Sequence, residues 1–192
     1  MNNIKQEFER EALVLGEDAV IKLNNSSVAL FGVGGVGSYA AEALARAGVG
    51  RIMLIDNDTV SRSNINRQLC ALHSTVGKPK VEVIKERILD INPLCEVTAL
   101  EKFYLPENSA EFSLEKYDYI ADAIDTVSAK IDLALKSQEY GIPMISCMGT
   151  GNKLDPVAFE VADISKTQVC PLARAVRTRL RKVGINHLKV VY

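Results

Sequence analysis

The sequence predicts an α/β protein with a doubly wound, mainly parallel sheet and helices on both faces of that sheet. Short apolar runs alternate along the chain with amphipathic segments of helical length, which is the pattern of strands joined by crossover helices. A glycine-rich stretch, residues 32–37, directly follows the first apolar run, residues 28–31. Such a strand, turn and helix bind nucleotides in Rossmann-like folds. The predicted fold is therefore Rossmann-like.

Each expected element follows from hydrophobic periodicity and from glycine or proline at its ends. Short helices over residues 7–23 form an N-terminal arm, residues 1–24, before the first strand. Strands are expected at residues 28–31, 51–56, 96–100, 117–124, 143–148, 158–161 and 188–192. Helices are expected at residues 35–47, 78–91, 129–140 and 171–183.

Composition favours one soluble globular domain over residues 1–192. Of the 192 residues, 47% are apolar and 24% are charged, and the net charge is −1. This charge gives no global attraction to nucleic acid, so an RNA partner would need a local basic surface. No apolar run reaches about 18 residues, so no membrane segment is expected and the cytoplasm is the default location. The apolar end at Val190 to Tyr192 is abrupt, and we expect the domain to continue past it.

The four cysteines are spaced far apart and form no C-x-x-C pair. Neither a zinc site nor a redox dithiol is therefore predicted. We expect them to be buried small hydrophobic residues. Cys147 and Cys170 are kept as less favoured candidates for a nucleophile.

Glycines at the end of the first strand predict a phosphate-binding turn. Gly32, Gly34, Gly35 and Gly37 let the backbone approach a phosphate at the N-terminus of the next helix. Asp56 ends the second strand about 20 residues later, where a carboxylate meets the ribose hydroxyls in nucleotide-binding folds. NAD-dependent dehydrogenases share these features, so they do not distinguish ATP from NAD.

Two cations and one carboxylate near strand ends favour carboxylate activation by ATP. Arg67 lies in the turn after the second strand, and Lys80 opens the next helix after Gly77 and Pro79. Cations are unfavourable near helix N-termini unless they meet an anion, so both are candidates for phosphate contacts. Asp125 ends a later strand and is expected to bind magnesium or the substrate, or else to cap the following helix. Asp122, inside that strand, is expected to be structural.

Five separated motifs occur in the order found in one superfamily. They are Gly32-x-Gly34-Gly35-x-Gly37, Asp56-x-Asp58, Ser63-Asn64-x-Asn66-Arg67-Gln68, Gly77-Lys78-Pro79-Lys80 and Asp125. With them the chain resembles the ubiquitin-activating-enzyme-like (ThiF/MoeB/HesA) adenylyltransferases.

This resemblance implies a site for ATP and Mg²⁺. Asp56 would hold the ribose, and Asn64, Arg67 and Lys80 the phosphates, while Asp125 would hold the magnesium. Asp58 and Gln68, which belong to the same motifs, would complete the nucleotide site. Members are typically homodimers in which an arginine of the N-terminal arm reaches the partner's ATP, and Arg10 is the residue that matches.

The second half of the chain is similar to one branch of the superfamily, the tRNA threonylcarbamoyladenosine dehydratases. The similar segments are residues 148–156, residues 159–164, Lys166-Thr167 and Pro171-Leu172-Ala173-Arg174. The resemblance implies an enzyme that adenylates the carboxylate of threonylcarbamoyladenosine in a tRNA anticodon loop. Attack by the modification's own carbamoyl group would then close a ring and release AMP, an intramolecular step that needs no enzyme nucleophile.

A basic helix supports an RNA substrate independently. On a helix from Pro171, the side chains of Arg174, Arg177 and Arg181 fall on one face, opposite Leu172, Val176, Leu180 and Val183. Residues 171–182 carry five cations and no acid. Such a face suits contacts with RNA phosphates, although a solvated basic face would have the same pattern.

Three alternatives stay open. A sulfur-carrier adenylyltransferase would share the ATP site but act on the C-terminal glycine of a ubiquitin-like protein; that branch usually carries two C-x-x-C zinc pairs, and here Cys170 stands alone. An NAD-dependent oxidoreductase would leave Arg67, Lys80 and Asp125 without a role. A regulatory scaffold would not need these polar residues at strand ends. A sulfur-relay protein is a further candidate partner.

Overall fold

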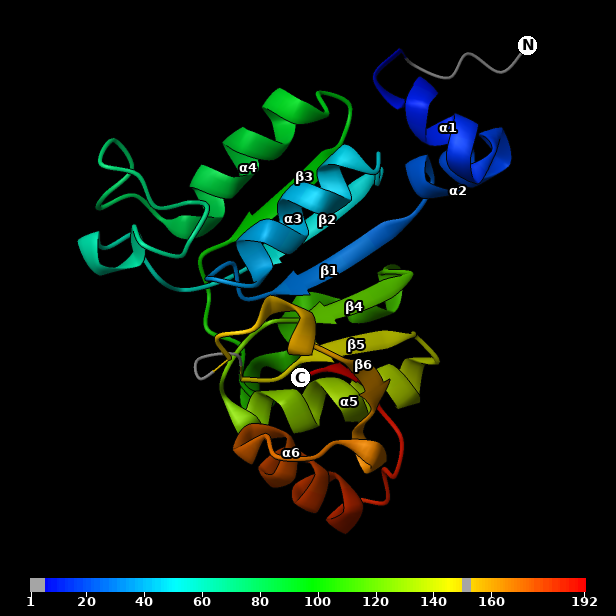
Figure 1. The fold of residues 1–192 in the computed structure, drawn as a ribbon, viewed down its shortest axis with the longest axis vertical. Helices are drawn as coiled ribbons and strands as arrows, with labels where there is room; N and C mark the ends of the chain where they lie inside the picture. Colours follow the sequence, from blue (N-terminus) through cyan, green and yellow to red (C-terminus); the bar gives the residue numbers. More distant parts are fainter. Residues whose placement is uncertain (1–5, 150–152) are drawn as a thin grey trace. The chain divides into compact units, whose positions relative to one another are not determined.

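The computed structural model of the protein describes residues 6–149 and 153–192. It divides into two compact units, Met1–Lys102 and Phe103–Tyr192, which are called the first and the second unit below. Each unit contains parallel strands and packed helices, so each has the α/β architecture expected from the sequence (Figure 1). The expectation of one domain over residues 1–192 stays a prediction.

The first unit starts with the predicted helical arm and continues as a three-stranded parallel sheet. The arm consists of η1 (Gln6–Phe8), α1 (Glu9–Leu15) and α2 (Glu17–Asn24). The strands are β1 (Ser27–Phe31), β2 (Arg51–Ile55) and β3 (Glu96–Leu100), in the order β3-β2-β1. β1 is buried along its whole length, as expected for an apolar strand that is covered on both faces.

Two helices complete the first unit, α3 (Gly37–Arg46) and α4 (Lys80–Ile91). They lie side by side, and Glu42 of α3 pairs with Arg87 of α4 (Figure 1). The arm packs closely on the start of β2: a Cβ atom at Gly50 would lie 1.8 Å from the carbonyl oxygen of Asn24. Only glycine therefore fits at this position.

The second unit contains three parallel strands and one antiparallel edge strand. The strands are β4 (Tyr119–Asp122), β5 (Met144–Cys147), β6 (Val161–Asp163) and β7 (Lys189–Val191), in the order β4-β5-β7-β6. β6 is antiparallel to β7, while the other pairs are parallel. Its helices, α5 (Val127–Tyr140) and α6 (Pro171–Lys182), pack against each other (Figure 1).

One predicted strand is wrong. Residues 158–161 were expected to form a strand, but the structure has the 3₁₀ turn η5 (Pro156–Ala158) there, and β6 begins only at Val161. The side chain of Asp155 accepts a hydrogen bond from the backbone N–H of Val157 and so folds this segment locally. The short 3₁₀ segments η2 (Arg62–Asn64), η3 (Pro106–Phe112), η4 (Leu114–Lys116) and η6 (Ile164–Lys166) were not predicted.

No helix among the described residues is long and apolar enough to cross a membrane.

Candidate functional site

The glycine-rich turn between β1 and α3 forms the centre of the candidate site in the first unit. Gly32 leaves β1 with φ of +82°, a conformation that strongly favours glycine. Its N–H donates to the carbonyl oxygen of Ile55 at 2.7 Å, which keeps the turn beside the end of β2. The N-terminus of α3 follows at Gly37. This geometry suits an anion, because helix N-termini carry unpaired N–H groups and a partial positive charge.

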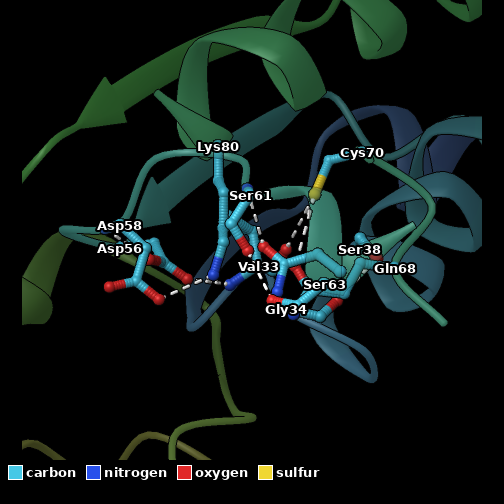
Figure 2. A network of polar contacts seen from close by, with 11 residues as sticks. Val33, Gly34, Ser38, Asp56, Asp58, Ser61, Ser63, Gln68, Cys70 and Lys80 are labelled. Atoms are coloured by element: carbon cyan, nitrogen blue, oxygen red, sulfur yellow. Dashed lines mark hydrogen bonds and ion pairs between the residues drawn. The ribbon is translucent and has the colours of Figure 1, made fainter. Parts of the chain in front are cut away.

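Asp56 connects the glycine turn to the segment that follows β2. Its Oδ2 accepts from the backbone N–H of Val33 at 2.8 Å, and its Oδ1 accepts from the N–H of Asp58 at 2.9 Å (Figure 2). A carboxylate has about four acceptor positions, so both oxygens keep capacity for a further donor. Asp56 therefore lies where the sequence predicts a ribose ligand, with its orientation already fixed by the backbone.

Lys80, the first residue of α4, holds a buried positive charge next to Asp58. Its Nζ lies 2.6 Å from Oδ2 of Asp58, and the exposed fractions of the two side chains are 5% and 59%. Figure 2 shows the lysine side chain directed toward Asp56, Asp58 and Val33. A buried cation needs a counter-charge, and here Asp58 supplies it. The structure thus gives Asp58 a definite role, as the partner of Lys80.

Two residues of this site were missed by the sequence analysis. Ser38 is fully buried in the first turn of α3; its hydroxyl donates to the carbonyl of Gly34 at 2.6 Å and accepts from the N–H of Leu69 at 3.2 Å. Cys70 places its Sγ 3.8 Å from the carbonyl oxygen of Val33 (Figure 2). Burial raises the pKa of the Cys70 thiol, so it stays protonated. The sequence offered one hint for Ser38, namely that a serine directly follows the glycine motif at Gly37.

The turn after β2 brings the predicted phosphate ligands against the glycines. Asn64 is nearly buried, and its Oδ1 accepts from the N–H of Ser61 at 3.0 Å, so it shapes the turn itself. The side chain of Gln68 lies 3.6 Å from the position that a Cβ atom would take at Gly34, and that of Arg67 lies 4.0 Å from the same position at Gly35. The exposed guanidinium of Arg67 donates to the carbonyl of Ser63 at 2.8 Å. The stem of Arg67 thus lies beside Gly35, while its guanidinium meets Ser63 and Asn66, and its contact to phosphates stays a prediction.

Arg10, the predicted contact to a partner's ATP, lies on α1 and is exposed to solvent. Its role stays a prediction.

Asp125, in the second unit, is exposed in the segment between β4 and α5. Thr126 occupies the N-cap position of α5 without a side-chain capping bond, so Asp125 is not the N-cap that the sequence left as an alternative. Within residues 6–149 and 153–192, no group of three or more histidine, cysteine or acidic side chains could hold a metal ion. One carboxylate still fits Mg²⁺ delivered with ATP, because Mg²⁺ takes its other ligands from phosphates and water.

Asp122 is structural, as expected, and its partner is Lys130 of α5. Both side chains are fully buried, and Lys130 Nζ lies 2.9 Å and 3.0 Å from the two carboxylate oxygens. The same ammonium donates to the carbonyl oxygen of Cys147 at 2.8 Å. Asp122 also accepts from the backbone N–H of Ile124. One buried charge pair thus fixes the ends of β4 and β5 and the segment that leads to Asp125.

The basic helix α6 is formed as predicted, but its arginines differ in environment. Arg174 and Arg181 are exposed. The guanidinium of Arg177 donates to the carbonyl oxygens of Thr167 at 2.9 Å and of Ile164 at 3.3 Å, so it fastens η6 to the helix. Val176 and Leu180 are buried, whereas Val183 is 45% exposed.

The other cysteines follow the expected pattern only in part. Cys95 is buried, while Cys147 and Cys170 are partly exposed. Burial also raises the pKa of Cys147. Part of the motif over residues 148–156, namely residues 150–152, lies outside the described residues.

The glycine turn, an acidic residue after β2 and a lysine at the start of α4 together define a nucleotide-binding α/β protein of the adenylating type. The chain belongs to the ThiF family, whose sequence profile matches residues 8–186. The resemblance to the adenylyltransferase superfamily is thereby confirmed.

Relatives extend the comparison over nearly the whole chain. It is 55% identical to the tRNA threonylcarbamoyladenosine dehydratase of Bacillus subtilis over 94% of this chain and 71% of that protein. The crystal structure of the Escherichia coli enzyme of the same name, TcdA, in complex with ATP is 40% identical, with a TM-score of 0.92 over 97% of this chain and 80% of that one. The Rossmann-like α/β fold is confirmed by this similarity. The adenylyltransferase and sulfurtransferase MOCS3 of Drosophila yakuba is 36% identical over 73% of this chain and 30% of its own length.

Proposed function

We propose that the chain catalyses the ATP-dependent dehydration of threonylcarbamoyladenosine in tRNA, by adenylating the carboxylate of this modified nucleoside. The main structural observation is that Asp56 and Lys80 both have fixed orientations next to the glycine turn. Asp56 offers an acceptor for a ribose, and Lys80 offers a cation for phosphates. The curated relative with 55% identity has the activity in its name. The similar crystal structure contains ATP.

The residues of the first unit would divide the work on ATP. Asp56 accepts hydrogen bonds from the ribose hydroxyls while it keeps its bonds to Val33 and Asp58. The N–H groups of the glycine turn face the phosphates. Lys80 and Arg67 neutralise the charge that builds up on the α-phosphate and on the leaving pyrophosphate. Bound Mg²⁺ would supply further positive charge, and Asp125 is the candidate ligand.

Ring closure requires no nucleophile from the protein. Once the threonyl carboxylate is adenylated, the carbamoyl group of the same nucleoside attacks the activated carbonyl carbon and releases a proton to solvent. The C–O bond to AMP breaks, and AMP carries away one carboxylate oxygen, so the nucleoside loses the elements of water overall. Tethering makes this attack intramolecular and therefore fast. The environment of Cys147 agrees, because burial raises the pKa of its thiol and so disfavours the reactive thiolate.

The proposal includes partners and a location. The anticodon loop of tRNA would meet α6 through the exposed Arg174 and Arg181, while Arg177 supports that surface from behind through its contacts to η6. A second copy of the chain would form a homodimer in which Arg10 reaches the partner's ATP. The cytoplasm follows from a tRNA substrate. A sulfur-relay protein stays a candidate partner for this enzyme.

The test is AMP release with three candidate substrates: tRNA that bears threonylcarbamoyladenosine, the same tRNA without it, and a ubiquitin-like carrier protein with a C-terminal glycine. We expect AMP to be released with the modified tRNA and with neither of the other two substrates. Release of pyrophosphate with the carrier protein, and with neither tRNA, would instead support the sulfur-carrier adenylyltransferase, because that enzyme leaves AMP bonded to the carrier's C-terminal carboxylate.

Variants of the ATP site test the residue assignments. Arg67→Ala and Asp125→Ala are each expected to abolish exchange of pyrophosphate into ATP in the presence of modified tRNA. Arg62→Ala removes an exposed arginine from the same turn as Arg67 and serves as the control with normal exchange. Normal exchange in the Arg67 or Asp125 variant would refute the corresponding role.

A further inference from the structure

We propose that a cavity in the second unit, at the N-terminus of α6, binds one nucleotide of the RNA substrate. The cavity has a volume of about 820 Å³, and its lining includes Lys153, Lys166, Gln168, Cys170, Leu172 and Tyr192. This volume lies in the range of small-molecule binding sites. The inference deepens the proposed function and rests on it, because it names the place where the RNA is held.

The charges around the cavity favour an anion. Lys153 and Lys166 both line it, and Glu160 is the acidic side chain of the lining. α6 starts at this cavity with Pro171, and no acidic residue occurs in its first turn. Pro171 has no N–H, and the N–H of Ala173 donates to Sγ of Cys170 at 3.5 Å, so this twelve-residue helix contributes mainly the partial positive charge of its dipole. Two ammonium groups and a helix N-terminus together suit a phosphate.

Aromatic rings lie next to these cations. The Nζ of Lys153 lies 5.0 Å from the ring centroid of Tyr192 and 4.8 Å from that of Phe159. The hydroxyl of Tyr192 donates to Oε2 of Glu160 at 2.9 Å, which fixes the ring and engages the one acid of the lining. A phosphate would draw Lys153 toward itself, and a base would gain the aromatic surface that the ammonium leaves. Nucleotides from single-stranded loops are bound by this combination of stacking and phosphate contacts.

The neighbouring surface favours an RNA chain over a free nucleotide. Arg174, in the first turns of α6, and Arg181, near its end, are exposed and carry the positive charge away from the cavity. A free nucleotide has no group that would use this charge, whereas an RNA chain presents a phosphate at every residue. One nucleotide in the cavity would therefore place its neighbours along α6.

Binding of a fluorescent anticodon stem-loop that bears threonylcarbamoyladenosine tests the inference, with AMP release measured in parallel. We expect Lys153→Gln and Lys166→Gln combined to weaken binding about tenfold at 0.1 M salt and to reduce the salt slope by about 0.7, the value for one lost phosphate contact, because both lysines face the same phosphate. Lys189→Gln removes the same charge from an exposed position on β7 outside the lining and is the matched control, with unchanged binding. Tyr192→Leu should weaken binding about fivefold or more, and Tyr192→Phe, which keeps the ring but frees Glu160 from its hydrogen bond, should weaken binding by less.

The outcomes separate the cavity from the enzyme activity. Normal stem-loop binding by the double lysine variant, with AMP release intact in the wild type, would overturn the cavity assignment and leave the function standing. Weaker binding by that variant together with no AMP release by the wild type would support the cavity and overturn the function. If free AMP displaced the stem-loop from the cavity as well as an RNA nucleotide does, the cavity would be a site for a free nucleotide and the proposal of an RNA site would be wrong. Loss of binding to a carrier-protein tail, with RNA binding unchanged, would also overturn the proposal.

Discussion

The two units use buried charge in opposite ways. In the first unit, the buried Lys80 is paired with Asp58, whose side chain is 59% exposed, so the pair opens to solvent on one side. In the second unit, Lys130 and Asp122 are both fully buried, and further bonds from Ser146 and to Cys147 enclose them. In the first arrangement the carboxylate of Asp58 meets solvent, while the ammonium of Lys80 lies buried behind it. The second uses its charges entirely to hold strands together.

Under the proposed function, this difference separates residues that meet the ligand from residues that hold the strands in place. A fully enclosed pair cannot exchange partners, so it contributes rigidity, and breaking it leaves an uncompensated charge. In the proposed ATP site, a phosphate would displace the exposed carboxylate of Asp58 from the ammonium of Lys80. Substitutions in the two units should accordingly separate stability from nucleotide binding.

The largest effect is expected for Lys130→Met. The change leaves the carboxylate of Asp122 buried without its cation and should lower the free energy of unfolding by about 3–5 kcal/mol. Lys136→Met on the same helix removes the ammonium of an exposed pair with Glu139 and should cost about 1 kcal/mol or less. Urea denaturation measures both. Equal losses of unfolding free energy in the two variants would show that the enclosed Lys130–Asp122 pair contributes no more to stability than an exposed pair.

Asp56→Asn should mainly affect nucleotide binding. An amide can replace only one of the two oxygen acceptors for Val33 and Asp58, and the loss of a charge-assisted bond costs about 1.5–3 kcal/mol. We expect the Kd for ATP to rise about tenfold or more, measured by isothermal titration calorimetry. Unchanged affinity would remove Asp56 from the ribose site.

A smaller effect is expected for Ser38→Ala. The substitution leaves the partly buried N–H of Leu69 without its acceptor and should cost about 1–2 kcal/mol of stability. The control is Ser128→Ala, which also changes the second residue of a helix but at an exposed position on α5. Urea denaturation of both variants measures the loss of stability, which should be larger for Ser38→Ala. Titration of the Ser38 variant with ATP shows whether the glycine turn has become less well ordered, because the affinity would then fall.

The smallest effect concerns Glu42→Gln and depends on pH. The hydrogen bond from Arg87 is the main cause that holds the pKa of Glu42 below the usual range of glutamate. A lowered pKa means that the ionised form is stabilised in the folded protein, so the contribution is present at neutral pH and is lost as the pH falls through the lowered pKa. We expect the variant to lose about 0.5–1 kcal/mol at pH 7. Its difference from the wild type should disappear in acid, and a difference that grows in acid would contradict this assignment.

The sequence predicted most strands and helices because their apolar residues repeat with a clear period. The predicted strand at residues 96–100 coincides with β3, and β1 and β2 differ from their predictions by one residue. The 3₁₀ segments were missed because they are short and carry no periodic pattern, and the residues before β6 were misassigned because Asp155 folds them locally.

Site residues were predictable where a strand end or a helix start exposes them. Asp56 and Lys80 have such positions in the chain, whereas Lys130 lies inside a helix, where a lysine normally faces solvent. Its pairing with Asp122 depends on tertiary packing. Arg177 illustrates the same limit: its spacing equals that of Arg174 and Arg181, but its guanidinium meets the carbonyl of Thr167.

The pairing of Lys80 with Asp58 also bears on how the reaction ends. If Lys80 meets the phosphates of ATP as proposed, the strong negative charge of the triphosphate competes with the single carboxylate of Asp58 for the ammonium. AMP carries less charge than ATP, so Asp58 competes better against the product than against the substrate. We therefore expect the carboxylate of Asp58 to favour release of AMP. At the end of each turnover, the ion pair between Lys80 and Asp58 would form again.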